Sequence, residues 1–170
     1  MKTVVVSFIA DDKPGLVNIL STTITDHGGN WLESNLSQLA GKFAGVIVVT
    51  VAAGHADQLI ASLQTLNEQG ISIVIEQANG DQMIPEYQTA VLDLVGHDKP
   101  GIVRDISNTL SSMGVNLASL ETELSPGSMS SELLFKACGE LQIPSSVDLN
   151  APQDALEEIA ADLMVDITIA

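Results

Sequence analysis

Residues 12–15 read Asp-Lys-Pro-Gly, and the same four residues return at positions 98–101, an offset of 98 − 12 = 86. Four matching residues alone would describe a common turn. Here the match continues at constant spacing through the apolar positions of a helix and on to a Gly-x-Asn, which predicts an internal duplication. Further pairs at this offset are Val17 and Val103, Leu20 and Ile106, Ile24 and Leu110, Gly28 and Gly114, Asn30 and Asn116, and Gly41 and Gly127.

Each copy opens with a β-branched run, VVVSFIA at 4–10 and TAVLDLVG at 89–96, and such runs favour strands. After each D-K-P-G the apolar residues recur with helical spacing up to a glycine, and proline's fixed φ suits the first helical turn. A strand pair, a second helix and a last strand follow in each copy. The expected strands are 30–40, 43–52, 71–75, 116–125, 129–138 and 165–169, and the expected second helices cover 56–66 and 155–163.

This order predicts an α+β fold of two ferredoxin-like βαββαβ domains, each an antiparallel sheet with two helices on one face. The predicted domains span 1–78 and 89–170, with a polar linker at 79–88 and a longer connection at 139–152. Each half is small for an independent core, and its strands are too apolar for a fully wet sheet face. We therefore expect the halves to dock on each other about a pseudo-twofold axis, and the sequence leaves a homodimer open.

The charge of the chain is strongly one-sided. Asp and Glu number 22 against 6 Lys and Arg, for a formal net charge of −16. Proteins bind nucleic acid largely through basic groups that displace counterions from phosphates. A surface this acidic repels DNA and anionic membranes, so we expect neither as a direct partner.

The chain holds one cysteine, Cys138, which excludes a disulfide within the chain. It follows the apolar run LLFKA, and free cysteines are usually buried, so we predict a small core residue. The apolar run at 4–10 is too short for a membrane span and has no small-residue cleavage site after it. We expect a cytoplasmic protein.

Candidate catalytic chemistry is sparse. The histidines His27, His55 and His97 lack metal-ligand spacing, and no nucleophile elbow or phosphate-binding glycine loop occurs. His97 and Asp98 are adjacent, but neighbouring side chains at a strand end usually point apart. His27 follows a predicted helix, where a cation is favoured, and is interpreted as structural. The sequence predicts no catalytic residue, no metal and no cofactor.

A βαββαβ unit with D-x-P-G at the first strand–helix turn and G-x-N at the second strand resembles an ACT domain. That family senses small ligands, mostly amino acids. The resemblance implies a site between paired domains, where the loop of one meets the second strand of the other. The implied ligand-binding residues are Asp12, Lys13, Pro14, Gly15, Leu16 and Asn30 in the first copy and Asp98, Lys99, Pro100, Gly101, Ile102 and Asn116 in the second.

The chemistry of these loops suits an amino acid. Backbone N–H groups after Pro14 or Pro100 lie at the positive end of a helix dipole, which attracts a carboxylate. Asp12 and Asp98 could accept an ammonium group, and a glycine lets a ligand approach the backbone closely. The alternative is structural: an aspartate before a helix is often a cap, and Pro-Gly a simple turn. The sequence does not decide which loop binds.

Two such domains, with D-K-P-G-L-V-N-I-L at 12–20, are also similar to a transcriptional repressor of that family. This resemblance implies a non-catalytic regulator that senses free glycine or another small amino acid. With its negative charge and no basic recognition helix, it would act by binding a DNA-binding transcriptional activator. An allosteric subunit or adaptor of an enzyme of amino-acid metabolism is the main alternative. A free-standing ligand-binding protein is a third.

Overall fold

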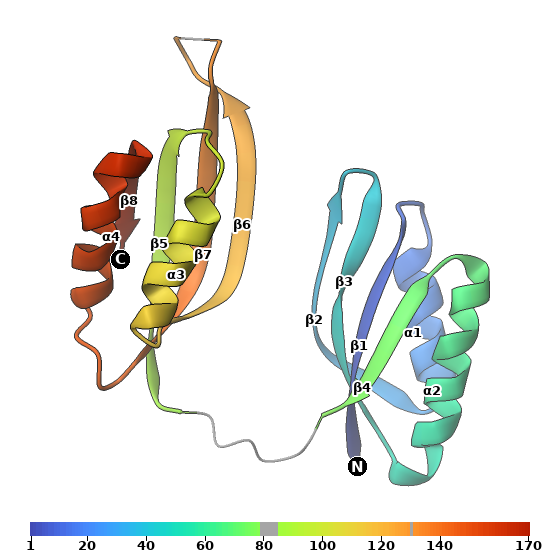
Figure 1. Cartoon of the computed structure of the whole chain (residues 1–170). Coiled ribbons are helices and arrows are strands. Elements are labelled where there is room, and N and C mark those ends of the chain that lie inside the picture. The colour runs from blue at the N-terminus through green and yellow to red at the C-terminus, as the bar shows by residue number, and fades with distance from the viewer. Residues whose placement is uncertain (79–84, 130) are drawn as a thin grey trace. The chain divides into compact units, whose positions relative to one another are not determined.

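The computed structural model describes residues 1–78, 85–129 and 131–170, and the chain divides into two compact units, Met1–Gln82 and Met83–Ala170 (Figure 1). Unit 1 contains β1 (Lys2–Asp11), α1 (Leu16–Asp26), β2 (Gly29–Leu39), β3 (Lys42–Val51), η1 (Ala53–His55), α2 (Ala56–Thr65), η2 (Leu66–Gln69) and β4 (Ser72–Gln77). Unit 2 contains β5 (Tyr87–His97), α3 (Ile102–Ser112), β6 (Asn116–Pro126), β7 (Leu133–Pro144), α4 (Ala151–Leu163) and β8 (Val165–Ile169).

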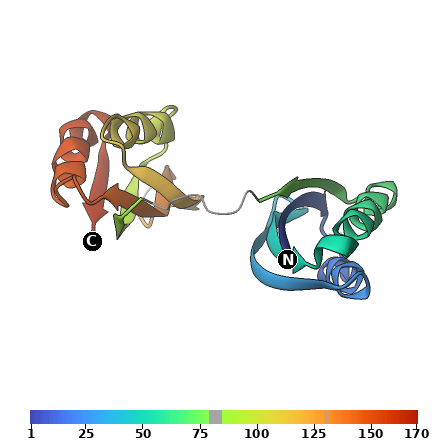
Figure 2. The ribbon, with the colours of Figure 1, turned by 90° about the horizontal axis from the view of Figure 1, so that it is seen from below.

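Each unit is one four-stranded antiparallel sheet. The strand orders are β2-β3-β1-β4 and β6-β7-β5-β8, so the first strand of each copy lies between the third and the last. The two helices of each unit lie on the same face of its sheet, as Figures 1 and 2 show. The predicted βαββαβ order and the ferredoxin-like fold of both copies are confirmed.

Each unit has its own aliphatic core between sheet and helices. In β1 the alternate residues Val4, Val6 and Phe8 are buried against the helices. In α1 the buried residues Leu16, Leu20 and Ile24 recur every four positions, the spacing of one helical face. The longest of the α-helices, α4, has 13 residues. Within the described residues, no helix has the length and hydrophobicity to cross a membrane.

The borders of some elements in unit 2 differ from the prediction. β7 runs from Leu133 to Pro144, so residues 139–144 of the expected connection at 139–152 are strand. The buried residues Leu141 and Ile143 alternate with more exposed neighbours and extend the strand beneath the helices. β5 begins at Tyr87, inside the predicted linker 79–88. Residues 79–84 of that linker lie outside the described residues.

The prediction that Cys138 is a core residue is wrong. Cys138 is exposed, while its neighbour Ala137 is buried. Alternate residues of a strand point to opposite faces, which places Cys138 on the face of the sheet away from the helices. A hydrogen bond to Asp93, its partner across the strands, raises the pKa of the Cys138 thiol. Less thiolate is therefore available for reaction.

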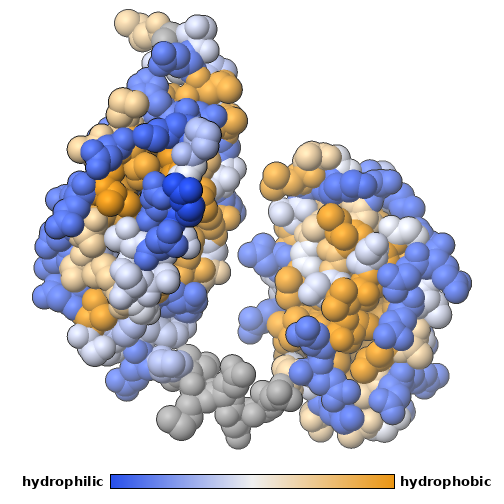
Figure 3. All heavy atoms as spheres, viewed as in Figure 1, coloured by the Kyte–Doolittle hydropathy of each residue, from blue (hydrophilic) through white to orange (hydrophobic). Residues whose placement is uncertain are grey.

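The sheet of unit 1 carries apolar side chains on the face away from its helices. Ile9, Val46 and Val74 occupy alternate positions to the core residues and remain exposed. Apolar residues of unit 1 reach the surface in Figure 3. The exposure of Ile9, Val46 and Val74 agrees with the sequence-based expectation of an apolar sheet face. The docking that would cover this face stays a prediction.

Candidate functional site

The first D-K-P-G motif forms the short loop between β1 and α1. The sequence had suggested that proline stands in the first helical turn, but the helix begins at Leu16. Gly15, just before it, adopts a left-handed conformation with φ of +94°. A residue with a Cβ avoids this conformation. The Gly15 carbonyl accepts the first helical hydrogen bond, from Ile19 N–H at 2.9 Å. The motif thus turns the chain sharply and starts the helix.

The N-terminus of α1 has no cap. Within the described residues, no side chain accepts a hydrogen bond at this helix start, and the first turn contains no acidic residue. The alternative that Asp12 serves as a helix cap is therefore wrong. The first N–H groups of a helix have no partner inside the helix and carry partial positive charge. The start of α1 remains available to an anion.

A shallow hollow of about 320 Å³ lies over this loop. Phe43 of β3 lines it, and the centroid of its ring lies 5.7 Å from that of Phe8 in the core. The hollow brings together four of the residues predicted from sequence with three that the sequence analysis missed. The predicted ones are Asp12, Lys13, Gly15 and Leu16, and the missed ones are Val17, Asn18 and Phe43.

The second loop repeats the backbone of the first with different side-chain contacts. Gly101 has φ of +97° and precedes α3 as Gly15 precedes α1. Nζ of Lys99 donates to the Asp162 carbonyl near the end of α4, at 2.9 Å. Nε of Arg104, in the first turn of α3, lies 2.9 Å from Oδ1 of Asp105.

Each loop is tied to the neighbouring hairpin at its first residue. Asp12 N–H donates to the Gly41 carbonyl at 2.9 Å, and Asp98 N–H donates to the Leu133 carbonyl at 3.2 Å. The residue before each motif adds a side-chain contact, and in unit 1 this is the ion pair of Asp11 with Lys42. The hydrogen bond and charge of Lys42 lower the pKa of Asp11. In unit 2 His97 Nδ1 lies 3.0 Å from Glu132 Oε2.

The predicted asparagines lie far from these loops in the same unit. Asn30 pairs with Thr50 of β3, whereas the loop adjoins Lys42, eight residues away along that strand. At roughly 3.3 Å per residue the separation is about 26 Å. Asn116 is likewise paired with Gln142 at the far end of β7, and its Nδ2 donates to Gln142 Oε1 at 2.9 Å. One domain alone therefore does not bring loop and asparagine together.

One of the three histidines, His27, has a structural role. The imidazole of His27 joins α1 to α2, because its Nε2 lies 2.8 Å from Ser62 Oγ and its Nδ1 lies 2.8 Å from the Thr23 carbonyl. The structural interpretation of His27 is confirmed. Within residues 1–78, 85–129 and 131–170, no group of His, Cys, Asp and Glu side chains could hold a metal ion.

Comparison with known proteins identifies the first unit. The family model of the ACT domain matches residues 2–76, nearly the whole of it. Residues 2–76 form an ACT domain. Unit 2 repeats the strand order and the loop of this ACT domain, so the chain has the fold of two ferredoxin-like ACT domains in tandem.

Two solved structures resemble the tandem ACT fold over its full length. An unknown protein from Galdieria sulphuraria has a TM-score of 0.87 at 25% identity, with 99% of this chain and 96% of that chain covered. A candidate glycine cleavage system transcriptional repressor has a TM-score of 0.71 at 17% identity and the same coverage. At 17% identity, the similarity to this second protein shows a shared fold and nothing further. No curated protein sequence matches the chain.

Proposed function

We propose that this tandem ACT-domain protein is a non-catalytic regulator that senses a small amino acid. The observation that carries the proposal is the hollow over the uncapped start of α1. It offers N–H groups for a carboxylate and, at its edge, Asp12 for an ammonium group. Leu16 and Phe43 give it an apolar wall, which suits a ligand with a small or apolar side chain.

Free glycine is the first ligand to test. The sequence resembles a glycine cleavage system transcriptional repressor in D-K-P-G-L-V-N-I-L at 12–20 and in its two domains. A candidate repressor of that kind shares the fold. Asn30 and Asn116 complete the proposed sites only when a second ACT domain, from this chain or from another copy, supplies them.

The regulator acts through a protein partner, and a DNA-binding transcriptional activator is the proposed one. The net charge of −16 opposes direct binding to phosphates. Of the six cationic side chains, Lys42 is paired with Asp11 and Arg104 with Asp105, which leaves still less free positive charge. We place the protein in the cytoplasm, where such a partner works.

Calorimetric titration of the full chain against the twenty amino acids tests the sensing step. Free glycine, or another small amino acid, should bind, and Asp12→Asn should weaken binding by removing the charge opposite the ammonium. Asp57→Asn, at an exposed position of α2, is the charge-matched control and should bind like wild type. Wild type that binds none of the twenty would contradict the proposal.

Fluorescence anisotropy with promoter and random duplexes tests the second step. The protein alone should give no salt-sensitive complex at physiological salt, because phosphate contacts need cations. Capture of partners on the purified protein, with and without free glycine, then separates the candidate functions. A transcriptional activator supports the proposal, whereas an enzyme of amino-acid metabolism would favour the allosteric-subunit alternative.

A further inference from the structure

The two loops are followed by different residues at one aligned position, Asn18 in unit 1 and Arg104 in unit 2. Arg104 is the single arginine of a chain in which 22 acidic side chains outnumber 6 basic ones. The helix dipole favours an anion, not a cation, in the first turn of a helix. The dipole of α3 therefore gives no reason for an arginine here.

The guanidinium of Arg104 lies over the glycine of its own loop. A Cβ built on Gly101 would lie 2.9 Å from Nη2 of Arg104 and 3.4 Å from its Cζ. Helical side chains lean toward the N-terminus of their helix, which brings this group back over the loop. At the corresponding point on Gly15, no atom of the described residues lies within 4 Å apart from Gly15 itself and its two chain neighbours.

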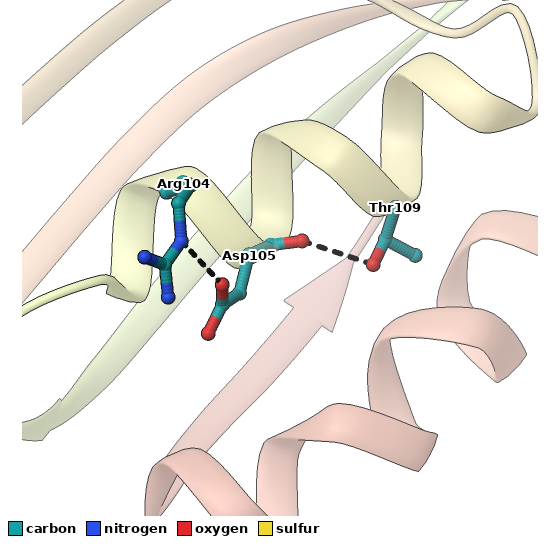
Figure 4. A network of polar contacts seen from close by, with 3 residues as sticks. All are labelled: Arg104, Asp105 and Thr109. Carbon is teal, nitrogen blue, oxygen red and sulfur yellow. Dashed lines mark hydrogen bonds and ion pairs between the residues drawn. The ribbon is translucent and has the colours of Figure 1, made fainter.

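The guanidinium of Arg104 is paired with the next residue, Asp105. The Arg104–Asp105 ion pair is formed within the first turn of α3 (Figure 4). The Asp105 carbonyl also accepts a hydrogen bond from Thr109 Oγ1 at 3.0 Å. The aligned residues of unit 1 are uncharged, Asn18 and Ile19, so both members of this pair belong to unit 2 alone.

We propose that the two loops are inequivalent: the loop of unit 1 binds the amino acid, and Arg104 closes the loop of unit 2. The guanidinium occupies the space over Gly101 through which a ligand would approach the helix start. The aligned lysines differ as well. Lys99 donates to the Asp162 carbonyl, whereas Lys13 lines the open hollow of unit 1. This inference rests on the proposed amino-acid sensing and names the copy that performs it.

Exchange of the two residues tests the proposal. Wild type, Asn18→Arg and Arg104→Asn are titrated as full chains with free glycine and the other amino acids by calorimetry. Wild type should bind one equivalent per chain. Asn18→Arg should lower the affinity by about tenfold or more, about 1.4 kcal/mol in the free energy of binding, because the added guanidinium would cover Gly15. Arg104→Asn should raise the number of bound equivalents from one to two.

Charge-matched variants separate a local effect from a change in net charge. Thr22→Arg adds the same cation one turn further along α1, on an exposed position, and Lys136→Gln removes a cation of unit 2 from β7. Both should bind like wild type. Thermal unfolding followed by Trp31 fluorescence checks that each variant is folded.

The other outcomes are distinct. Loss of binding in Arg104→Asn would make Arg104 a ligand contact and unit 2 the working copy, and the inference would be overturned. Binding by Asn18→Arg at wild-type affinity would also overturn it, while amino-acid sensing would stand. Wild type that binds no amino acid would overturn the proposed function and this inference together.

Discussion

The loops at 12–15 and 98–101 have the same four residues and almost the same backbone, with φ of +94° and +97° at their glycines. They differ in what lies over them. A hollow opens above the first, and the guanidinium of Arg104 covers the second glycine. The motif thus sets the path of the chain, whereas a residue three positions after its glycine sets the chemistry. A shared motif in a duplicated protein does not by itself mean a shared site.

The two hairpins beside the loops differ in the same way. Both hold the first residue of the motif by a backbone hydrogen bond. In unit 1 the strands are joined tightly at Ala40 and Gly41, with Lys42 next to Asp11. In unit 2 the connection from Pro126 to Leu133 is longer and contributes Glu132 to His97. The backbone support is common to the copies, but the charges around it are not.

The largest expected effect concerns the separate cores. Leu20 and Ile106 occupy aligned buried positions in α1 and α3. Either residue changed to Ala should cost about 2–5 kcal/mol of its own unit's stability, because a buried cavity remains. The single tryptophan, Trp31, reports on unit 1, and the single tyrosine, Tyr87, reports on unit 2. Leu20→Ala should shift the Trp31 transition in urea and leave the Tyr87 ring signals in NMR unchanged; a common shift of both would contradict two independent cores.

A smaller effect should follow from the loop glycines. Gly15→Ala and Gly101→Ala should each cost about 1–2 kcal/mol, because a Cβ disfavours positive φ. The added Cβ at 101 meets only the flexible end of Arg104, so the two costs should be nearly equal. Urea denaturation measures both. A much larger loss of stability in Gly101→Ala than in Gly15→Ala would mean that Arg104 is held rigidly. The extra loss should then disappear when Gly101→Ala is combined with Arg104→Asn.

The asparagines should matter less for stability than for binding. Asn30→Ala and Asn116→Ala should each change the free energy of unfolding by under about 0.5 kcal/mol, as exposed polar substitutions usually do. Asn116→Ala should have the larger effect of the two, because it loses the hydrogen bond to Gln142. Calorimetry with free glycine should show weaker binding for the asparagine of the working site. Asn35→Ala, also exposed on β2, is the control; a collapse of the melting temperature with unchanged affinity would make the asparagines structural.

The smallest effect concerns pH. Lys42 holds the pKa of Asp11 below its ordinary value, so this ion pair stabilises the fold above the pKa of the unfolded chain. The stabilisation is lost as the pH falls through the lower, folded-state pKa. Lys42→Met should therefore raise the pKa of Asp11 in an NMR titration and destabilise unit 1 slightly at neutral pH, with no difference from wild type in acid. An unchanged pKa of Asp11 in Lys42→Met would contradict the pair, and Lys136→Met is the distant control.

Local pattern explains which of the sequence-based predictions succeeded. The β-branched runs and the four-residue spacing of Leu16, Leu20 and Ile24 follow from side-chain geometry within one element. The errors arose where an element's end depends on distant packing. β7 continues to Pro144 because Leu141 and Ile143 find a core to enter, and Cys138 is exposed because the strand's register turns it outward.

In the candidate site, too, residues close in sequence could be predicted and residues brought in by strand pairing could not. Four residues of the hollow could be predicted because they belong to the turn itself or directly follow it in the sequence: Asp12, Lys13, Gly15 and Leu16. Phe43 could not, since its place beside the loop depends on the pairing of Ala10 with Phe43 across two strands. Asn18 could have been noticed by aligning the two copies, because its counterpart is the chain's single arginine, Arg104. The separation of Asn30 from the loop appears only once the strands are paired.

The sequence by itself determined the duplication, the order of strands and helices, and the acidity that opposes nucleic acid. These depend on residue type and on spacing within one element, so they can be read along the chain. The tertiary structure decided which residues meet Gly15, where the asparagines lie, and that Arg104 lies back over Gly101. These depend on strand register and on side-chain direction, which are fixed when distant segments pack together. Two loops with one motif therefore differ in chemistry because their surroundings differ.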